Sequence, residues 1–205
     1  MTMHRQNSRV SERPAVRDHP AGEADDAALV AAARRDPAHF APLYERYFPR
    51  IYAYCLRRVD SAQEAEDLTS AIFIKALDGL AAFRGGSVAA WLFTIAHHAV
   101  ANHYRDRRAH VPLEEAAAIL PDEEPAPLEQ VLKAEHVTAI RALVADLPQE
   151  QRDLLALKLT GGLSAAEIGQ VVGKSAGAVR VELHRIISRL RDRYAQQTGE
   201  QGDRA

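Results

Sequence analysis

Apolar residues recur at three- and four-residue steps along much of the chain, which is the spacing of one buried face on an α-helix. The clearest run spans residues 39–59. Its apolar and aromatic positions are Phe40, Leu43, Tyr44, Tyr47, Ile51, Tyr54 and Cys55. No stretch alternates apolar and polar residues with the period of two that half-buried strands require. The pattern therefore predicts an all-α fold.

Capping signals mark where further helices begin. Ser61 with Glu64, and Ser164 with Glu167, have the serine-x-x-glutamate spacing of a capping box, in which each side chain bonds the backbone of the other residue. Together with the apolar spacing, these signals predict helices at 61–79, 88–108, 130–146, 148–159, 164–172 and 175–194.

Three stretches without helical periodicity divide the chain into two helical units. Residues 1–24 and 196–205 are polar, so both are predicted to be disordered tails. Residues 111–129 contain four prolines and six acidic residues, which predicts a flexible linker. The two predicted domains are then residues 25–110 and residues 130–195. The first helix of the first domain is predicted to begin near residue 25.

Composition narrows the class of protein. A length of 205 residues suffices for one or two small cores, and the net charge of −2 gives no sign of a nucleic-acid partner. Cys55 is the single cysteine, which excludes an internal disulfide and suits a reducing compartment. No apolar run approaches the length of a membrane span, and the N-terminus lacks the apolar segment of a signal peptide. These features predict a cytoplasmic protein with no membrane partner.

The last two predicted helices are joined by a very short turn. Gly173 suits the left-handed conformation that ends a helix, and Ser175 can cap the next helix at once. Such a pair crosses steeply, as in a helix-turn-helix, whose second helix can enter the major groove of DNA. Residues 174–193 carry six lysines and arginines against Glu182 and Asp192, a charge excess that suits phosphate contact. A plain helical hairpin with a solvated basic face is the alternative.

The first unit carries short segments in a specific order. They are EDL at 66–68, FIKA at 73–76, FRG at 83–85, WLFTIA at 91–96 and NHYRDRR at 102–108. Followed by the acidic linker and the helix-turn-helix, they resemble the extracytoplasmic-function sigma factors, small two-domain sigma subunits of bacterial RNA polymerase. The resemblance covers residues 25–194. It implies that 25–110 and 130–195 are sigma regions 2 and 4, and that the chain binds core RNA polymerase and directs promoter-specific transcription initiation.

The resemblance also implies three sets of binding residues. Those for core RNA polymerase are Glu66, Asp67, Phe73 and Lys75. Those for the single-stranded minus-ten promoter element are Arg84, Gly85, Gly86, Ser87, Asn102, Arg105, Arg107 and Arg108. Those for the duplex minus-thirty-five element are Lys174, Ser175, Arg180, Val181, His184 and Arg185. Arginine can pair bidentately with guanine, and lysine or serine can hold phosphates.

Some of these positions have alternative interpretations. Phe73 could be buried beside a core Ile72 instead of contacting the polymerase. Trp91 could stack a base, but it heads an apolar run and is expected in the core. Many family members carry Ser-Arg where this chain has Val181-Glu182, and Glu182 would either repel phosphate or accept a hydrogen bond from a cytosine amine.

Enzymatic and metal chemistry find no support in the sequence. His97, His98 and His103 lie at gaps of one, five and six, whereas metal ligands on a helical face need three or four. We expect no catalytic residue, metal or cofactor; the partners implied are core RNA polymerase, promoter DNA and an anti-sigma factor. The alternative functions are a helix-turn-helix regulator with a helical N-terminal sensory domain, and a helical adaptor.

Overall fold

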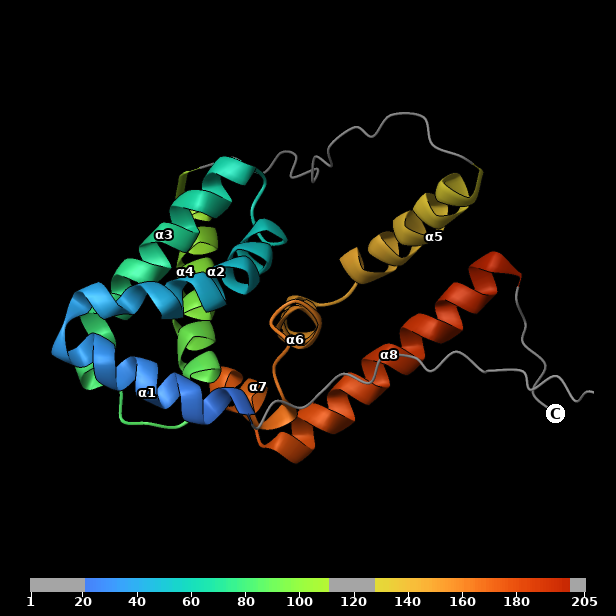
Figure 1. The fold of residues 1–205 in the computed structure, drawn as a ribbon. Coiled ribbons are helices and arrows are strands. Elements are labelled where there is room, and N and C mark those ends of the chain that lie inside the picture. Colours follow the sequence, from blue (N-terminus) through green and yellow to red (C-terminus); the bar gives the residue numbers. More distant parts are fainter. Residues whose placement is uncertain (1–20, 111–127, 200–205) are drawn as a thin grey trace, which may run out of the picture.

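The computed structural model of the chain describes residues 21–110 and 128–199 (Figure 1). Side chains are described within 25–106 and 136–199. The helices are α1 (Ala21–Arg35), η1 (Pro37–Phe40), α2 (Ala41–Leu56), α3 (Ala62–Gly79), η2 (Leu80–Ala82), α4 (Val88–His110), α5 (Leu128–Ala145), α6 (Gln149–Leu159), α7 (Ala165–Val172) and α8 (Ala176–Thr198). No strand occurs in these two ranges, and the all-α prediction is confirmed.

The first unit is a bundle of α1 to α4. Its centre is aromatic: Tyr54 of α2 meets Phe93 of α4 edge to face, with ring centroids 5.6 Å apart. Ile51, Ile72 and Leu92 are fully buried around this pair. The apolar periodicity of α2 is what brings these side chains to one face, against α3 and α4.

Capping explains where α3 and α4 begin. Ser61 accepts a hydrogen bond from the backbone N–H of Glu64, as its sequence spacing predicts. The Glu64 carboxylate reaches back one residue further than a standard capping box and accepts from the N–H of Asp60. Ser87 caps α4 in the same way, because its hydroxyl accepts from the N–H of Ala90.

The second unit contains α5 to α8, and its turn has the predicted geometry. The capping box of Ser164 and Glu167 is complete. Gly173 ends α7 with a φ of 70°, in the left-handed region, and Ser175 caps α8 through the N–H of Ala178. Ile168 of α7 lies in the buried core, as do Val179, Leu183 and Ile186 of α8. A helix-turn-helix therefore forms as the sequence predicts.

The two units share one hydrophobic core. In Figure 1, α7 lies at the foot of α4, and these two helices pack together. Ile168 and Leu163 of the second unit belong to the same buried cluster as Phe93 of the first. The covalent connection between the units, residues 111–127, lies outside the described residues, so the linker prediction falls there.

Several helix limits differ from the predicted ones. The helix expected at 39–59 is split into η1 and α2, because Asp36 caps a short turn that begins at Pro37. Helix α1 begins four residues before 25, and α8 continues to Thr198. Residues 1–20 and 200–205 of the expected tails lie outside the described residues, and the division into domains stays a prediction.

Candidate nucleic-acid interface

The first turns of α8 separate a buried face from a basic exposed face. Val179 and Leu183 point into the core, so the residues between them face outward. Arg180, His184 and Arg185 are exposed, and Val181 keeps 50% of its surface accessible. These four side chains, all predicted to contact the minus-thirty-five duplex, lie along two successive turns of one helix.

Lys174 is paired with the acidic residue of this helix. Its Nζ lies 2.8 Å from Glu182 Oε2 and 3.8 Å from a carboxylate oxygen of the more exposed Glu150. The hydrogen bond to Glu182 raises the pKa of Lys174. Glu182 therefore forms an ion pair with Lys174 and is not an isolated negative charge on α8. Lys174, for its part, would have to leave this ion pair before it could contact a phosphate.

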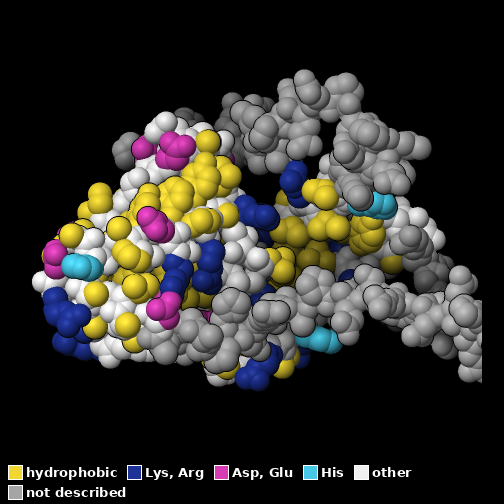
Figure 2. Space-filling model, viewed as in Figure 1, with side chains coloured by type: hydrophobic (Ala, Val, Ile, Leu, Met, Phe, Trp, Pro, Cys, Tyr) yellow, Lys and Arg dark blue, Asp and Glu magenta, His cyan; other side chains and the backbone are white. Residues whose placement is uncertain are grey.

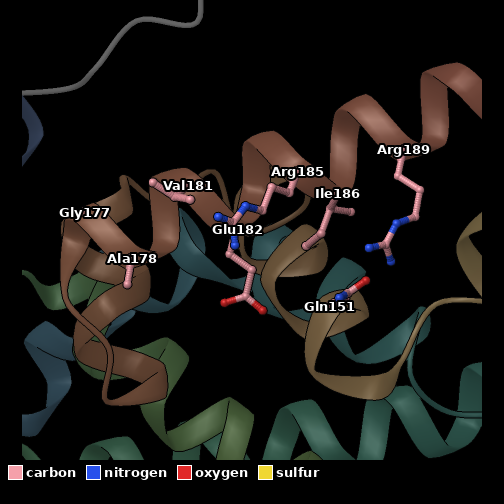
Figure 3. Close-up of a pocket in the computed structure, with 8 residues that line it drawn as sticks. All are labelled: Gln151, Gly177, Ala178, Val181, Glu182, Arg185, Ile186 and Arg189. Atoms are coloured by element: carbon pink, nitrogen blue, oxygen red, sulfur yellow. The ribbon is translucent and has the colours of Figure 1, made fainter.

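A groove of about 490 Å³ runs between α6 and the exposed face of α8 (Figure 3). Its lining residues are Gln151, Gly177, Ala178, Val181, Glu182, Arg185, Ile186 and Arg189. Sequence reasoning missed Gln151 and Arg189 as members of this surface. Arg189 is four residues beyond Arg185, so the two lie on the same face of the helix. This spacing could have placed Arg189 on the surface from sequence alone. Gln151 comes from another helix, and no sequence spacing indicated it.

The loop before α4 forms a second candidate DNA surface. Arg84 is exposed, and Gly85 and Gly86 have φ values of 95° and 90°. A hollow of about 360 Å³ lies against this loop. It is lined by Gly79, Ala82, Phe83, Arg84, Gly85, Ser87, Ala90, Trp91, Thr94 and Gln170.

Trp91 takes an intermediate position between the two sequence interpretations. Its ring packs on Phe83 with centroids 5.0 Å apart, and the residue is half-buried against the core. It also lines the hollow beside the loop. Trp91 thus both packs against the core and lines the hollow.

The remaining predicted minus-ten residues lie far along α4. Asn102 and Arg105 are exposed, and the Arg105 guanidinium donates a 2.8 Å hydrogen bond to Asn102 Oδ1. Asn102 is fifteen positions after Ser87, or roughly 23 Å further along at the α-helical rise. The structure therefore places the loop and this pair at different levels of one helix. Arg107 and Arg108 belong to α4, but their side chains lie outside the described residues.

The predicted polymerase-binding helix, α3, presents a mixed acidic and apolar face. Glu66, Asp67 and Lys75 are exposed, whereas Phe73 keeps only 5% of its surface accessible. The Phe73 ring packs against Tyr44, with centroids 4.7 Å apart.

The exposed apolar side chains of α3 are Ile74, at 61% accessible, and Leu77. Sequence reasoning missed both, although Ile74 stands two turns after Asp67 and so shares its face. Figure 2 shows hydrophobic side chains gathered over α2 and α3, with acidic groups beside them.

One histidine of α4, His97, has a hydrogen-bonding partner in the core. His97 Nδ1 lies 3.3 Å from the Tyr54 hydroxyl, and burial lowers the pKa of His97. In the described part of the chain, no three histidine, cysteine or acidic side chains are grouped so as to hold a metal ion.

Two family models match the chain in order. Sigma-70 region 2 matches residues 43–110, which hold α3, the loop and α4. Sigma-70, region 4 matches residues 138–190, which hold the helix-turn-helix. Relatives that cover two thirds or more of this chain and of their own length are described as ECF RNA polymerase sigma factors. The chain belongs to the family of ECF RNA polymerase sigma factors.

Relatives of this sigma factor come from several bacteria. It is 32% identical over 178 residues to BldN of Streptomyces coelicolor, covering 83% of this chain and 67% of that one. It is 36% identical over 155 residues to ShbA of Streptomyces griseus, covering 70% and 81%. It is 32% identical over 182 residues to SigD of Mycobacterium tuberculosis, covering 83% and 84%. The predicted family resemblance is confirmed, and the sensory regulator is set aside.

Solved structures share the fold of this sigma factor. CnrH, in complex with the cytosolic domain of CnrY, is 22% identical with a TM-score of 0.61, covering 82% of this chain and 95% of that one. RpoE of Bartonella quintana, in complex with the anti-sigma factor NepR, is 23% identical with a TM-score of 0.58, covering 75% and 94%. Within the described residues of the sigma factor, no helix is long and apolar enough to cross a membrane.

Proposed function

We propose that this sigma factor binds core RNA polymerase through α3, captures the minus-ten element as a single strand through the loop and α4, and reads the minus-thirty-five element through α8. The observation that carries the proposal is the order of the two matched regions in one chain, 43–110 and then 138–190. Each region presents exposed arginines on the helix or loop assigned to DNA.

The chemistry of this function needs no catalytic group in the chain. The polymerase joins nucleotides, and the sigma factor contributes binding energy and discrimination between promoters. Core polymerase contacts are assigned to Glu66, Asp67 and Lys75, with Ile74 and Leu77 as the accessible apolar centre that Phe73, being buried, does not supply. The proposed location is the cytoplasm, where polymerase and promoters are.

Base reading in the minus-thirty-five duplex is assigned to Arg180 and His184. Arg185 and Ser175 would hold phosphates, and Lys174 would do so only when it leaves Glu182. In the minus-ten element, the loop from Arg84 to Ser87 would hold the backbone, and Trp91 would contact an unstacked base.

An anti-sigma factor is the third proposed partner. Support comes from the fold neighbour RpoE, whose structure contains the anti-sigma factor NepR, and from CnrH, whose structure contains the cytosolic domain of CnrY.

Transcription with purified components tests the proposal. We expect core RNA polymerase plus the purified chain to give discrete run-off transcripts from genomic templates, and core alone to give none. Promoter binding by the chain without any effect on transcription would instead indicate a duplex-binding regulator.

Substitutions on α8 test the assignment of the duplex reader. Arg180→Ala with Arg185→Ala should lower promoter-specific transcription about tenfold or more, since one bidentate base contact is worth about 1–3 kcal/mol. Arg191→Ala, an equally exposed site three turns further along α8, is the matched control and should have little effect. Unchanged promoter use in the double variant would favour a purely structural adaptor.

A further inference from the structure

Among the described residues, three side-chain contacts join the second unit to the first in addition to the shared core. Arg58 after α2 forms an ion pair with Asp153 of α6. Arg50 of α2 donates to the carbonyl oxygen of Gly161, with Nε 3.0 Å away. The Ser87 hydroxyl donates to Glu167 Oε1 of α7 at 2.5 Å. We call these the interdomain contacts.

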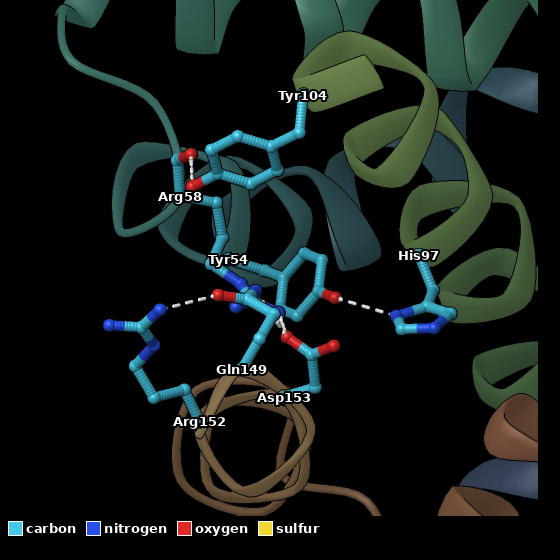
Figure 4. A network of polar contacts seen from close by, with 7 residues as sticks. All are labelled: Tyr54, Arg58, His97, Tyr104, Gln149, Arg152 and Asp153. Atoms are coloured by element: carbon cyan, nitrogen blue, oxygen red, sulfur yellow. Dashed lines mark hydrogen bonds and ion pairs between the residues drawn. The ribbon is translucent and has the colours of Figure 1, made fainter. Parts of the chain in front are cut away.

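The ion pair is the most deeply placed of the three (Figure 4). The side chain of Arg58 is 6% accessible, that of Asp153 is 14% accessible, and the guanidinium lies 5.3 Å from the centre of the Tyr54 ring. Asp153 also accepts a 2.9 Å hydrogen bond from Gln149 of its own helix. Removing either member of a buried pair leaves the other charge without a partner in a dry site, which strongly disfavours that arrangement.

Arg50 fastens the segment between α6 and α7 to the first bundle. Its guanidinium lies over the rings of Tyr47 and Phe93, 5.2 and 5.6 Å from their centres, while it bonds the Gly161 carbonyl. A Cβ added to Gly161 would lie 3.0 Å from the Phe93 ring, so the backbone approaches this ring as closely as a glycine allows.

The hydrogen bond between Ser87 and Glu167 involves a residue of the proposed minus-ten surface. Ser87 belongs to that surface, and Gln170 of α7 lines the same hollow as Arg84 and Trp91. Burial opposes ionisation of Glu167, but hydrogen bonds from Ser87 and Ser164 outweigh it and lower the pKa of that carboxyl. A charged Glu167 beside the loop also disfavours a nearby phosphate.

The proposed function requires the two units to separate. Minus-ten and minus-thirty-five elements lie about 25 base pairs apart, or roughly 85 Å at 3.4 Å per step. Here α7 packs directly on α4, so one molecule in this arrangement cannot place the loop on one element and α8 on the other.

We propose that the α4 and loop surface of region 2 is a shared docking surface. In the free sigma factor its occupant is α6–α7 of the same chain, held by the interdomain contacts, and single-stranded promoter DNA displaces it. The inference rests on the proposed function, because it assumes that the loop binds the minus-ten strand.

The test uses the full chain and the variant Asp153→Lys, which places a second positive charge against Arg58. Small-angle scattering gives the radius of gyration, and fluorescence anisotropy gives the affinity for a labelled single-stranded DNA dodecamer of mixed sequence. We expect a compact wild type and an expanded variant. The variant should bind the dodecamer more tightly by the inverse of the wild-type open fraction, about tenfold if one molecule in ten is open.

Two further variants separate docking from charge and from misfolding. Asp146→Lys makes the same charge change in the same unit, but its partner Arg193 is also in that unit, so both measurements should stay near wild type apart from the effect of charge. Arg58→Glu combined with Asp153→Lys restores an ion pair and should restore compactness and weaker DNA binding. Helical content by circular dichroism reports whether each variant folds.

Three results would overturn the shared docking surface without contradicting the proposed function. An expanded wild type, or an Asp153→Lys protein that is folded but as compact and as weak in DNA binding as wild type, would overturn it. So would an Asp146→Lys protein that tightens DNA binding as much as Asp153→Lys does. Core-dependent transcription by the wild type would leave the proposed function standing in each of these cases.

Discussion

At the scale of single residues, Glu182 differs most from its sequence interpretation. From the sequence alone, an acidic residue in this basic helix indicated either repulsion of a DNA phosphate or a hydrogen bond from a cytosine amine. In the structure its carboxylate forms an ion pair with Lys174, which lies eight residues earlier, in the turn of the helix-turn-helix. Because this pair occupies Lys174, we expect α8 to bind duplex DNA less tightly than its number of basic residues alone would indicate.

Glu182→Gln should release Lys174 for phosphate contact. We expect tighter duplex binding and a plot of log affinity against log salt that is steeper by about one unit, because one more counterion is released. Fluorescence anisotropy with duplex DNA over a range of KCl concentrations measures both quantities.

The control for this prediction is Glu150→Gln, whose carboxylate is 3.8 Å from Lys174 and mostly exposed. It should change the salt dependence much less. Adding Lys174→Ala to Glu182→Gln should abolish the gain. An unchanged slope in Glu182→Gln would show that the pair does not restrain Lys174.

Residue-level prediction succeeded where the signal was local. Ser164, Gly173 and Ser175 could be placed from sequence, since caps and left-handed turns depend on neighbours within three residues. Phe73 was ambiguous because helical periodicity alone does not say how wide a buried face is. Arg58 with Asp153 could not be foreseen, because residues 95 positions apart leave no spacing pattern.

At the scale of elements, the helix-turn-helix depends on the turn that re-aims α8. Gly173 adopts a φ of 70°, a conformation that side chains with a Cβ adopt only at a cost. Gly177, four residues later, lies inside α8. A Cβ at either position would meet no atom within 4 Å, so packing contributes nothing to a comparison of the two.

Alanine at these two glycines should therefore change stability in opposite directions. Gly173→Ala is expected to lower the free energy of unfolding by about 1–2 kcal/mol, the penalty of a left-handed L-residue. Gly177→Ala should raise it by about 0.5–1 kcal/mol, since alanine in a helix loses less entropy on folding. Urea unfolding followed by circular dichroism measures both. Equal signs would mean that the turn of α7 and α8 is not held in this conformation in solution.

At the scale of the whole molecule, the two sigma regions share one buried core, so we expect them to unfold cooperatively. The sequence predicted two helical units from the loss of periodicity between them, and both units are present. It did not predict that they pack together, because each has the amphipathic faces of a self-sufficient bundle. Leu163 and Ile168, both fully buried, show that the interface uses apolar side chains as well as the interdomain contacts.

Cooperativity predicts one unfolding transition for the free protein. Trp91 is the single tryptophan and reports on the first unit, whereas far-ultraviolet circular dichroism reports on helices of both. Thermal midpoints from the two probes should coincide for the wild type. In Asp153→Lys, where the units are expected to part, the midpoints should diverge. Distinct wild-type midpoints would show that the units fold independently.

The chain that joins the two units also sets how often they meet. Residues 111–127 link the end of α4 to the start of α5 and cannot span more than about 60 Å even fully extended. A partner confined within such a radius is present at an effective concentration of about 2 mM or more. Even an interface too weak to survive between separate proteins would keep the units together at that concentration, and a competing DNA strand has to offset the docking of α6–α7 as the linkage strengthens it.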